Sequence, residues 1–389
     1  MWRERLLKGE YNMAPANILI CTVGASLFRP NLEALRQRLE DPKLDERSRH
    51  LAEAYQRQDW KKVAEALRAF DPQEQICGAE INSTANLLQR NYVSDKCGLF
   101  FVHSDTADGE NIAQVLVHYY QMLGHAPVQA VRISDLQDSE PARFRVQGLR
   151  NLTREMCRVI RQYSTYTCAI NATGGYKAQI AIAVLLGQAL GVPVYYKHER
   201  FSEIISFPPI PVALDFELWM RASGMLFDIE VSSEPIPAEL YTTDWDERYE
   251  SLVERIEVDG RTYLDLSPVG QIFHETLKHR FRSYHNRLLP PPAEEKRPPK
   301  ITQRIKNQKL KDFLQRLTDE IPQVIQCATV SIASESPGRA GFRLQKGRIE
   351  GTFRDGSSSV RFYVETTARN ESEALAMVAK LNEWLYSIG

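Results

Sequence analysis

The chain of 389 residues contains no apolar run close to the roughly 20 residues that a membrane-spanning helix needs. Its six cysteines form no CxxC pair and no Cys/His spacing suited to zinc, so the sequence favours neither a disulfide scaffold nor a zinc site. Residues 1–11 are charged and the first apolar run is short, which is not typical of a secretory signal. These absences predict a cytoplasmic protein with no membrane partner and no bound metal.

Two familiar phosphate-binding motifs are also missing. No GxGxxG follows the first apolar run, which disfavours a dinucleotide-binding domain, and no GxxxxGK[ST] is present, which disfavours a P-loop enzyme. The length favours two domains, and the net charge of −1 does not by itself indicate a partner.

Short apolar runs alternate with helical segments from about residue 15 to residue 210. Strands are expected at 17–23, 98–103, 128–133, 166–170, 192–196 and 203–207. Helical spacing is found at 32–39, 48–69, 109–123, 150–163 and 177–190. Strands that alternate with helices and are apolar on both faces are typical of a parallel, doubly wound sheet. We therefore predict an α/β domain over residues 15–210.

The pattern changes after residue 210. Residues 201–259 hold 14 Asp and Glu against three Lys and Arg, and a Leu-Ser-Pro-Val-Gly turn at 266–270 opens a further helix. We expect a small connector over residues 211–288, either helical or winged-helix-like. The proline-rich residues 289–299 predict a semi-rigid linker between domains.

Residues 300–389 indicate a separate α+β domain. A basic helix at 304–317 precedes expected strands at 324–333, 341–345, 348–354 and 359–366, and a helix at 371–386 closes the chain. Short turns between these strands favour an antiparallel sheet. Residues 296–389 carry 16 Lys and Arg against 10 Asp and Glu, a local positive surplus of six that the acidic connector hides in the whole-chain charge.

Small polar residues follow three of the expected parallel strands. They are Gly24, Ala25 and Ser26, then Ser104, Asp105 and Thr106, and finally the loop Asn171-Ala172-Thr173-Gly174-Gly175. Ligands of open α/β sheets bind at the carboxyl ends of the strands, where glycines allow close backbone approach and helix N-termini attract anions. Lys177, just inside the following helix, adds a charge suited to phosphate. These residues predict a nucleotide or phosphate site.

The segments Cys21-Thr-Val-Gly-Ala-Ser-Leu27 and Asn171-Ala-Thr-Gly-Gly-Tyr-Lys-Ala-Gln179 resemble the two signature motifs of CARF domains, the cyclic-oligoadenylate sensors of type III CRISPR systems. The resemblance spans about residues 15–210 and implies a Rossmann-like fold, a homodimer, and one ring-shaped ligand shared by two pockets. Cyclic tetraadenylate is the expected activator, with cyclic hexaadenylate as the alternative and no other cofactor. Some similar domains cut their ligand slowly, which would involve Ser26 and Lys177 here.

Successive side chains of a strand point to opposite faces, so the sequence predicts which residues of the C-terminal strands point into the core. Phe342, Ile349 and Phe362 are expected to point into the core, which places the intervening residues outward. The outward set is Arg343, Arg348, Arg354, Arg361 and Tyr363, with Arg339 and Lys346 in adjoining turns. A basic surface that carries an aromatic side chain is suited to RNA.

A helix, a small basic antiparallel sheet and a closing helix resemble RelE-type toxins, which are ribosome-dependent messenger-RNA interferases. The resemblance implies metal-independent cleavage by basic residues and a tyrosine, with messenger RNA and the ribosome as partners. The candidates for phosphate stabilisation are Arg339, Arg343, Arg348 and Arg361, and Tyr363 is the candidate for stacking or proton transfer. The whole chain is similar to a CARF–RelE fusion.

Two alternatives stay open at this point. Arg280 and His285 satisfy RxxxxH, the pattern of HEPN ribonucleases found in many CARF effectors. A winged-helix module opening at residues 266–270 would instead make the protein a non-enzymatic transcription regulator, although the acidic residues beside it disfavour DNA binding.

Overall fold

The computed structural model describes residues 14–198, 201, 203–211, 213–232, 234–302, 305, 307–333, 340–355 and 358–387. The chain divides into two compact units, residues 1–213 and residues 214–389. The first unit has one sheet, the second unit has two, and each unit has its own hydrophobic core residues.

The first unit is built on a six-stranded sheet. Its strands are β1 (Ala16–Thr22), β2 (Val93–His103), β3 (Val128–Arg132), β4 (Cys168–Asn171), β5 (Val194–Lys197) and β6 (Ile204–Phe207). The order is β3-β2-β1-β4-β5-β6, in which only the edge strand β6 runs antiparallel to its neighbour. The predicted parallel α/β sheet is therefore confirmed.

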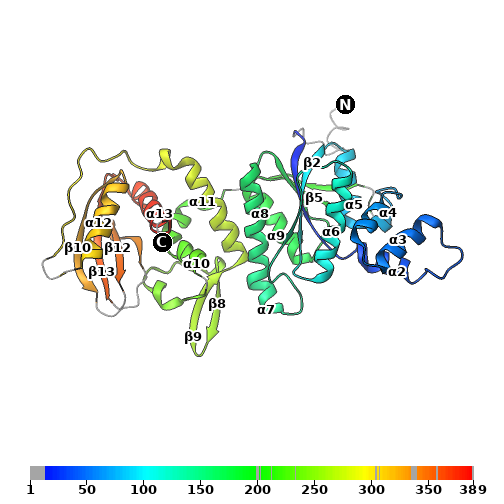
Figure 1. Cartoon of the computed structure of the whole chain (residues 1–389). Coiled ribbons are helices and arrows are strands. Elements are labelled where there is room, and N and C mark those ends of the chain that lie inside the picture. Colours follow the sequence, from blue (N-terminus) through cyan, green and yellow to red (C-terminus); the bar gives the residue numbers. More distant parts are fainter. Residues whose placement is uncertain are drawn as a thin grey trace. The chain divides into compact units, whose positions relative to one another are not determined.

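Helices cover both faces of this sheet (Figure 1). The α-helices of this unit are α2 (Glu33–Arg36), α3 (Glu46–Gln56), α4 (Trp60–Leu67), α5 (Gly78–Gln89), α6 (Ala107–Met122), α7 (Pro141–Arg143), α8 (Leu149–Tyr163) and α9 (Lys177–Leu190). Figure 1 shows α5 and α6 on one face and α8 and α9 on the other. The segment between β1 and β2 carries α2 to α5, which with α6 enclose one continuous apolar core.

Two features of this unit differ from the sequence-based expectation. The helix expected at 48–69 is two helices, because Gln58 takes a positive φ of 55° and Asp59 starts α4 by accepting a hydrogen bond from the Lys62 N–H. Helix α5 was not expected at all. Its Asn-Ser-Thr run interrupts the apolar spacing by which a buried helix face is recognised in a sequence. In the structure Ser83 and Thr84 nevertheless face the protein interior and are buried.

The second unit contains two antiparallel sheets and four helices among its described residues. Its elements are α10 (Phe216–Val231), β7 (Ile236–Pro237), β8 (Val253–Val258), β9 (Arg261–Leu266), α11 (Pro268–Leu288), α12 (Gln308–Glu320), β10 (Val324–Ala333), β11 (Gly341–Gln345), β12 (Arg348–Asp355), β13 (Ser358–Thr366) and α13 (Glu371–Ser387). The three-stranded sheet has the order β7-β9-β8, and the four-stranded sheet has the order β10-β13-β12-β11. The predicted antiparallel sheet is confirmed.

The four-stranded sheet is covered by helices on one face. Phe342, Ile349 and Phe362 point into a core that they share with apolar residues of α12 and α13. The register pairs Arg343 with Glu350 and Glu350 with Tyr363, which puts all three side chains on the opposite face. The two faces are thus divided as the alternation predicts.

Helix α13 belongs to two cores at once. Its Met377 and Leu381 pack under the four-stranded sheet, while Leu375 and Ala379 pack with Trp219 of α10. The closing helix of the predicted C-terminal domain therefore shares its surface with the first helix of the predicted connector, and the two segments form one compact unit.

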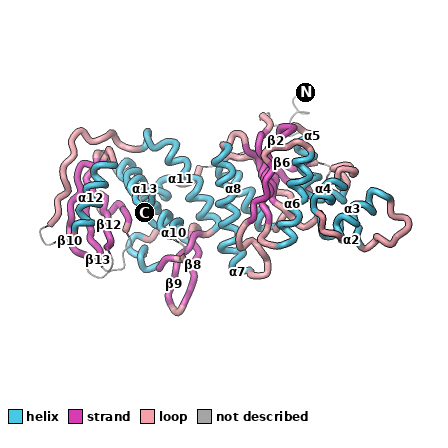
Figure 2. The backbone as a smooth tube through the Cα atoms, viewed as in Figure 1, coloured by secondary structure: helices cyan, strands magenta, loops and turns pink. Residues whose placement is uncertain are grey.

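The proline-rich segment follows the outer edge of β10. The N–H groups of Arg297 and Lys300 donate to the carbonyls of Ile325 and Cys327, both at 2.9 Å. Figure 2 shows this segment as a loop along the β10 side of the sheet. An extended segment on the edge strand satisfies backbone groups that would otherwise be open to another chain. The segment expected as a linker is thus part of the fold of this unit.

Candidate functional site

The three polar strand ends lie on neighbouring strands. β1 pairs with β2 on one side and with β4 on the other, all in parallel, so their carboxyl ends meet at one edge of the sheet. The turn Gly24–Ser26, the segment Ser104–Thr106 and the loop Asn171–Gly175 are consequently neighbours, as the sequence analysis assumed. Their role in binding a ligand stays a prediction.

The first turn and the second loop touch through their backbones. The Thr22 hydroxyl donates to the Gly174 carbonyl at 2.6 Å, and a Cβ added at Gly24 would lie 2.6 Å from the Gly175 nitrogen. Gly175 has a φ of 98°, and a Cβ there would collide with the side chain of Gln179, which is fully buried. Glycine is therefore required at both places for the loops to approach each other.

The Asn171 side chain faces the protein interior. It is 1% exposed, and its amide donates to the Ser83 hydroxyl at 2.8 Å while its carbonyl accepts from the Thr173 hydroxyl at 2.6 Å. Thr173 in turn accepts from the Lys197 N–H at 3.0 Å. These two motif side chains tie the loop to α5 and to β5, while Ala172 is fully buried.

Ser26 also serves the fold. Its hydroxyl oxygen accepts a hydrogen bond from the Ala79 N–H at 3.0 Å, which joins the first turn to the start of α5. The oxygen keeps its own proton for a further acceptor. Ala25 is exposed beside it, so the tip of this turn is open to solvent.

The residues after β2 form a helix cap and hold an arginine. Thr106 starts α6 by accepting from the Gly109 N–H at 3.1 Å, and it lies 2.8 Å from the Ser104 hydroxyl. Asp105 accepts from the Arg132 Nε at 2.6 Å and from the Asp135 N–H at 3.0 Å. These bonds hold the pKa of Asp105 below its usual value despite partial burial. Arg132, which the sequence analysis did not single out, extends this edge of the sheet with a positive charge.

Unsatisfied donors gather around the second loop. No acceptor among the described residues is found for the N–H groups of Gly174, Gly175 and Lys177, the last of which opens α9. The Lys177 side chain is exposed and makes no ion pair with a described residue. Free N–H groups at a helix start together with an unpaired ammonium form a site for an anion.

A buried acid that the sequence analysis missed lies behind this site. Glu80 of α5 is 1% exposed, and its Oε1 accepts from the Gly24 N–H at 2.6 Å. Burial raises the pKa of Glu80 to about 7, although the bond from Gly24 lowers it. The sequence signal was weak, because a single Glu in the first turn of a helix is ordinary on a solvated surface.

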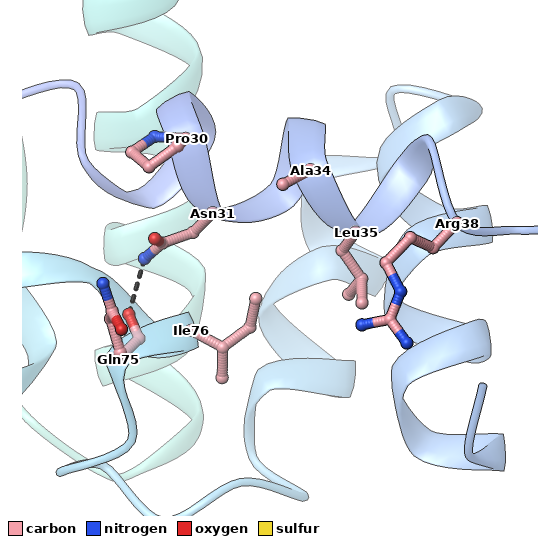
Figure 3. A pocket seen from close by; sticks show the side chains of 7 residues that line it. All are labelled: Pro30, Asn31, Ala34, Leu35, Arg38, Gln75 and Ile76. Atoms are coloured by element: carbon pink, nitrogen blue, oxygen red, sulfur yellow. Dashed lines mark hydrogen bonds between the residues drawn. The ribbon is translucent and has the colours of Figure 1, made fainter. Parts of the chain in front are cut away.

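A hollow of about 370 Å³ lies beside α2 (Figure 3). It is lined by Pro30, Asn31, Ala34, Leu35, Arg38, Gln75 and Ile76. The Asn31 amide donates to the Gln75 carbonyl at 2.5 Å across one end of it, as Figure 3 shows. None of the predicted ligand-binding residues lines this hollow.

The basic face of the C-terminal sheet contains an internal ion pair. Arg343 Nη2 lies 2.7 Å from Glu350 Oε1, and the Glu350 side chain is 5% exposed. Arg348 lies over the Tyr363 ring, 5.5 Å from its centroid. Arg361 is exposed on the same face, opposite Thr352.

Two other arginines, Arg354 and Arg339, were expected on or beside this face. Arg354 is exposed on the same strand as Arg348, and Arg339 lies outside the described residues. The structure thus brings Arg343, Arg348, Arg361 and Tyr363 to one face. It also shows that the charge of Arg343 is balanced by a buried acid.

The RxxxxH residues both lie on α11. Arg280 is exposed, and the His285 Nδ1 lies 2.7 Å from the Arg282 carbonyl of the same helix. Residues five apart on a helix point in different directions, so these two side chains do not converge within one chain.

Among the described residues, no group of three or more His, Cys, Asp or Glu side chains is arranged to hold a metal ion. In the same residues, no helix is both long and apolar enough to cross a membrane.

Residues 75–210 match the family model of "CRISPR-associated protein (Cas_APE2256)". Among solved structures, the chain is similar to Can2 from Sulfobacillus thermosulfidooxidans in complex with cyclic tetra-adenylate, at 11% identity and a TM-score of 0.24, covering 69% of this chain and 67% of that one. It is also similar to protein VC1899 from Vibrio cholerae, at 8% identity and a TM-score of 0.24, covering 90% of this chain and 77% of that one. Among the curated proteins, no relative matches the chain.

Proposed function

We propose that the chain is an ancillary effector of type III CRISPR systems whose first unit is a CARF-type sensor of a cyclic oligoadenylate. The match of residues 75–210 to a CRISPR-associated family supports the biological setting. The observation that carries the proposal is the meeting of both motifs at adjacent strands, with free N–H groups and Lys177 at the start of α9. Such a site suits the phosphates of a nucleotide ring.

Cyclic tetraadenylate is the ligand that we assign, with cyclic hexaadenylate as the alternative. Two copies of the chain would each offer one such edge, and a homodimer would bind one ring across both. Calorimetry of the full chain with cyclic triadenylate, tetraadenylate and hexaadenylate tests this assignment, with linear tetraadenylate as the control. One ring bound per two chains supports the proposal, and no uptake of any ring overturns it.

The second unit supplies the effector in this proposal, a RelE-like ribonuclease that cleaves messenger RNA. Arg348, Arg361 and Tyr363 lie together on a face of the sheet that the helices leave open, which supports contact with a phosphate backbone and a stacked base. The residues need no metal ion for this chemistry, because cationic side chains can stabilise a crowded phosphate. Arg343 has a secondary part, since Glu350 already balances its charge.

Cleavage assays distinguish a RelE-like ribonuclease from a HEPN-type ribonuclease. Translating ribosomes with messenger RNA, and naked RNA, are each incubated with the protein and each cyclic oligoadenylate. Ribosome-dependent cleavage that requires Arg361 supports the RelE-like reading. Cleavage of naked RNA that is lost in His285→Ala but kept in Arg361→Ala would instead support a HEPN-type enzyme.

A non-enzymatic regulator is the second alternative. The residues between β7 and β8, where a winged-helix module would carry its DNA-reading helix, form only two short helical turns, Ala238–Asp244 and Glu247–Ser251. Their acidic residues repel a DNA backbone. A gel-shift with duplex DNA, with and without cyclic tetraadenylate, tests this reading, and ligand-dependent binding without RNA cleavage would favour it.

Slow cleavage of the ligand by Ser26 and Lys177 is a further part of the proposal. Both residues are at the candidate site, and the Ser26 hydroxyl keeps a proton to donate while its oxygen accepts from Ala79. Lys177 would stabilise charge on the phosphate as the neighbouring ribose 2′-hydroxyl attacks it and gives its proton to water. The bond from phosphorus to the 5′-oxygen breaks, a 2′,3′-cyclic phosphate forms, and the leaving 5′-oxygen takes the proton of Ser26, which water replaces. Intact cyclic tetraadenylate after long incubation with excess protein would contradict this activity.

A further inference from the structure

Glu80 is an unusual residue to find behind an anion site. Its side chain is buried, its Oε1 accepts from the Gly24 N–H at 2.6 Å, and its Oε2 is buried with no hydrogen-bond partner among the described residues. A Cβ at Gly174 would collide with Oε1, so the carboxyl reaches the place where the first turn and the second loop touch. It thus contacts both motifs of the candidate site.

A buried carboxylate with one unpaired oxygen is costly, because a charge in the protein interior loses its hydration. A protonated carboxyl is less costly and can keep the bond from Gly24 to its carbonyl oxygen. The pKa of Glu80 is raised to about 7 by burial, so both forms are populated near neutral pH.

Among the described residues, no cationic side chain pairs with Glu80. The Cys21 thiol of β1 is an ionisable group that interacts with Glu80, and burial raises the pKa of Cys21 so far that the thiol stays neutral. The other neighbours on β1, β4 and α5 offer hydroxyl, amide and backbone groups, such as Thr22, Asn171 and Ser83. His103 at the end of β2 is also buried, and burial lowers its pKa, which disfavours its charged form.

We propose that Glu80 is a positioning residue that holds the Gly24 turn against the Gly174 loop and takes up a proton when an anionic ligand binds there. The inference rests on the proposed function, because it needs a phosphate at these loops. A phosphate that arrives at the loops repels the ionised carboxylate and favours its protonated form. Ligand binding and proton uptake are therefore linked.

The sign of the linkage follows from this repulsion. The complex binds more protons than the free protein, so affinity is greatest below the pKa of the free carboxyl and weakens as the pH rises through it. A ligand-induced rise of one pKa unit corresponds to a tenfold change in affinity, so we expect the Kd to rise by about threefold to tenfold between pH 6 and pH 8.5.

Calorimetry with cyclic tetraadenylate tests the inference on the full chain. Titrations at pH 7 in PIPES and imidazole, buffers of different ionisation enthalpy that contain no phosphate, report the number of protons taken up. We expect a fraction of one proton per site in the wild type and none in Glu80→Gln, whose amide oxygen can still accept from Gly24. The Kd of Glu80→Gln should be independent of pH.

Control variants separate this role from a merely structural one. Glu65→Gln removes an exposed acid on α4 and should leave proton uptake unchanged. Glu80→Ala removes the acceptor for the Gly24 N–H and should bind more weakly at every pH. Should Glu80→Gln fail to fold, the two-buffer measurement on the wild type still decides. Binding without proton uptake and without pH dependence would overturn the inference and leave the proposed function intact, whereas no binding at any pH would overturn both.

Discussion

The polar side chains of the two motifs are largely occupied by the protein itself. Asn171 is bonded to α5, Thr173 to β5, and Ser26 accepts from the start of α5. The groups left for a ligand are backbone N–H groups, the Lys177 ammonium and the proton of the Ser26 hydroxyl, because no described residue pairs with them. At the scale of single residues, the motifs thus shape a backbone site and supply one cation.

Lys177→Ala should weaken binding of cyclic tetraadenylate by about tenfold to a hundredfold, because hydrogen bonds to charged groups contribute about 1.5–3 kcal/mol. Lys177→Arg, which keeps the charge, should lose less. Calorimetry at fixed salt measures both. Lys61→Ala on α4, which removes an exposed lysine outside the site, is the matched control and should bind as the wild type does. Equal affinity of Lys177→Ala and wild type would contradict a role of this ammonium.

Gly175→Ala should destabilise the first unit by about 1–3 kcal/mol, since the φ of 98° is strained for alanine and the new Cβ meets the buried Gln179 side chain. Gly191→Ala is the control, because its φ is 73° and a Cβ there meets nothing within 4 Å. Chemical denaturation of both variants isolates the effect of crowding from the effect of φ. If Gly175→Ala lowers the free energy of unfolding no more than Gly191→Ala does, the loop at Gly175 can shift to accommodate the new Cβ.

At the scale of elements, the sequence allowed most of the parallel sheet to be predicted, because its strands are continuous apolar runs that end at glycine or polar residues. It also placed the three polar strand ends on one edge. Helix α5 could not be predicted, because its Ser83 and Thr84 are buried partners of Asn171, which lies 88 and 87 residues further along the chain. Glu80 was missed for the same reason, since its burial depends on contacts between distant segments.

The C-terminal face illustrates a similar limit. Alternation predicted which side chains point outward, but it could not show that Glu350, an outward residue, would be buried by its neighbours and pair with Arg343. An outward position in a strand describes direction and not exposure, because long side chains on adjacent strands can cover a shorter one. The basic face is therefore less uniformly positive than its sequence suggests.

Asn171→Ala should lower the free energy of unfolding by about 1–3 kcal/mol, because it removes two buried hydrogen bonds, from the Asn171 amide to the Ser83 hydroxyl and from the Thr173 hydroxyl to the Asn171 carbonyl. Urea denaturation followed by circular dichroism measures this loss. Asn31→Ala, which removes an exposed amide bonded to the Gln75 carbonyl, should change stability by about 0.5 kcal/mol or less. A stable Asn171→Ala protein with lost ligand binding would show that the amide contacts the ligand instead.

Arg348→Ala and Arg361→Ala should each weaken RNA binding and reduce its salt dependence, because each arginine that neutralises a phosphate releases about one counterion. Arg343→Ala should have a smaller effect, since Glu350 already pairs with this side chain. Binding of single-stranded RNA over a range of salt concentrations measures the slope. Arg316→Ala on α12, on the helical side of the sheet, is the control. If log Kd depends on log salt concentration with the same slope in Arg348→Ala, Arg361→Ala and the wild type, the proposal that this face binds RNA is contradicted.

At the scale of the whole molecule, charge and packing divide the chain differently. The acidic residues 201–259 and the basic residues 296–389 differ strongly in composition, which suggests a boundary at the proline-rich segment. The packing instead joins both parts, because α13 buries one face under the C-terminal sheet and another against α10. Composition reports on the solvent-facing residues, whereas a compact unit is defined by what its apolar residues contact.

The fragment 214–389 should therefore fold by itself, whereas the fragment 300–389 should not. Removing residues 214–299 exposes Leu375, Ala376 and Ala379 of α13, and it removes the part of the proline-rich segment in which the Arg297 N–H donates to β10. Exposed apolar surface and an open strand edge together favour aggregation over a folded state. Urea denaturation of both fragments, followed by circular dichroism, measures whether each unfolds cooperatively. We expect one cooperative transition for 214–389 and none for 300–389. A cooperative transition of 300–389 at the same midpoint would show that the C-terminal sheet is an independent domain and that its contact with α10 contributes little to stability.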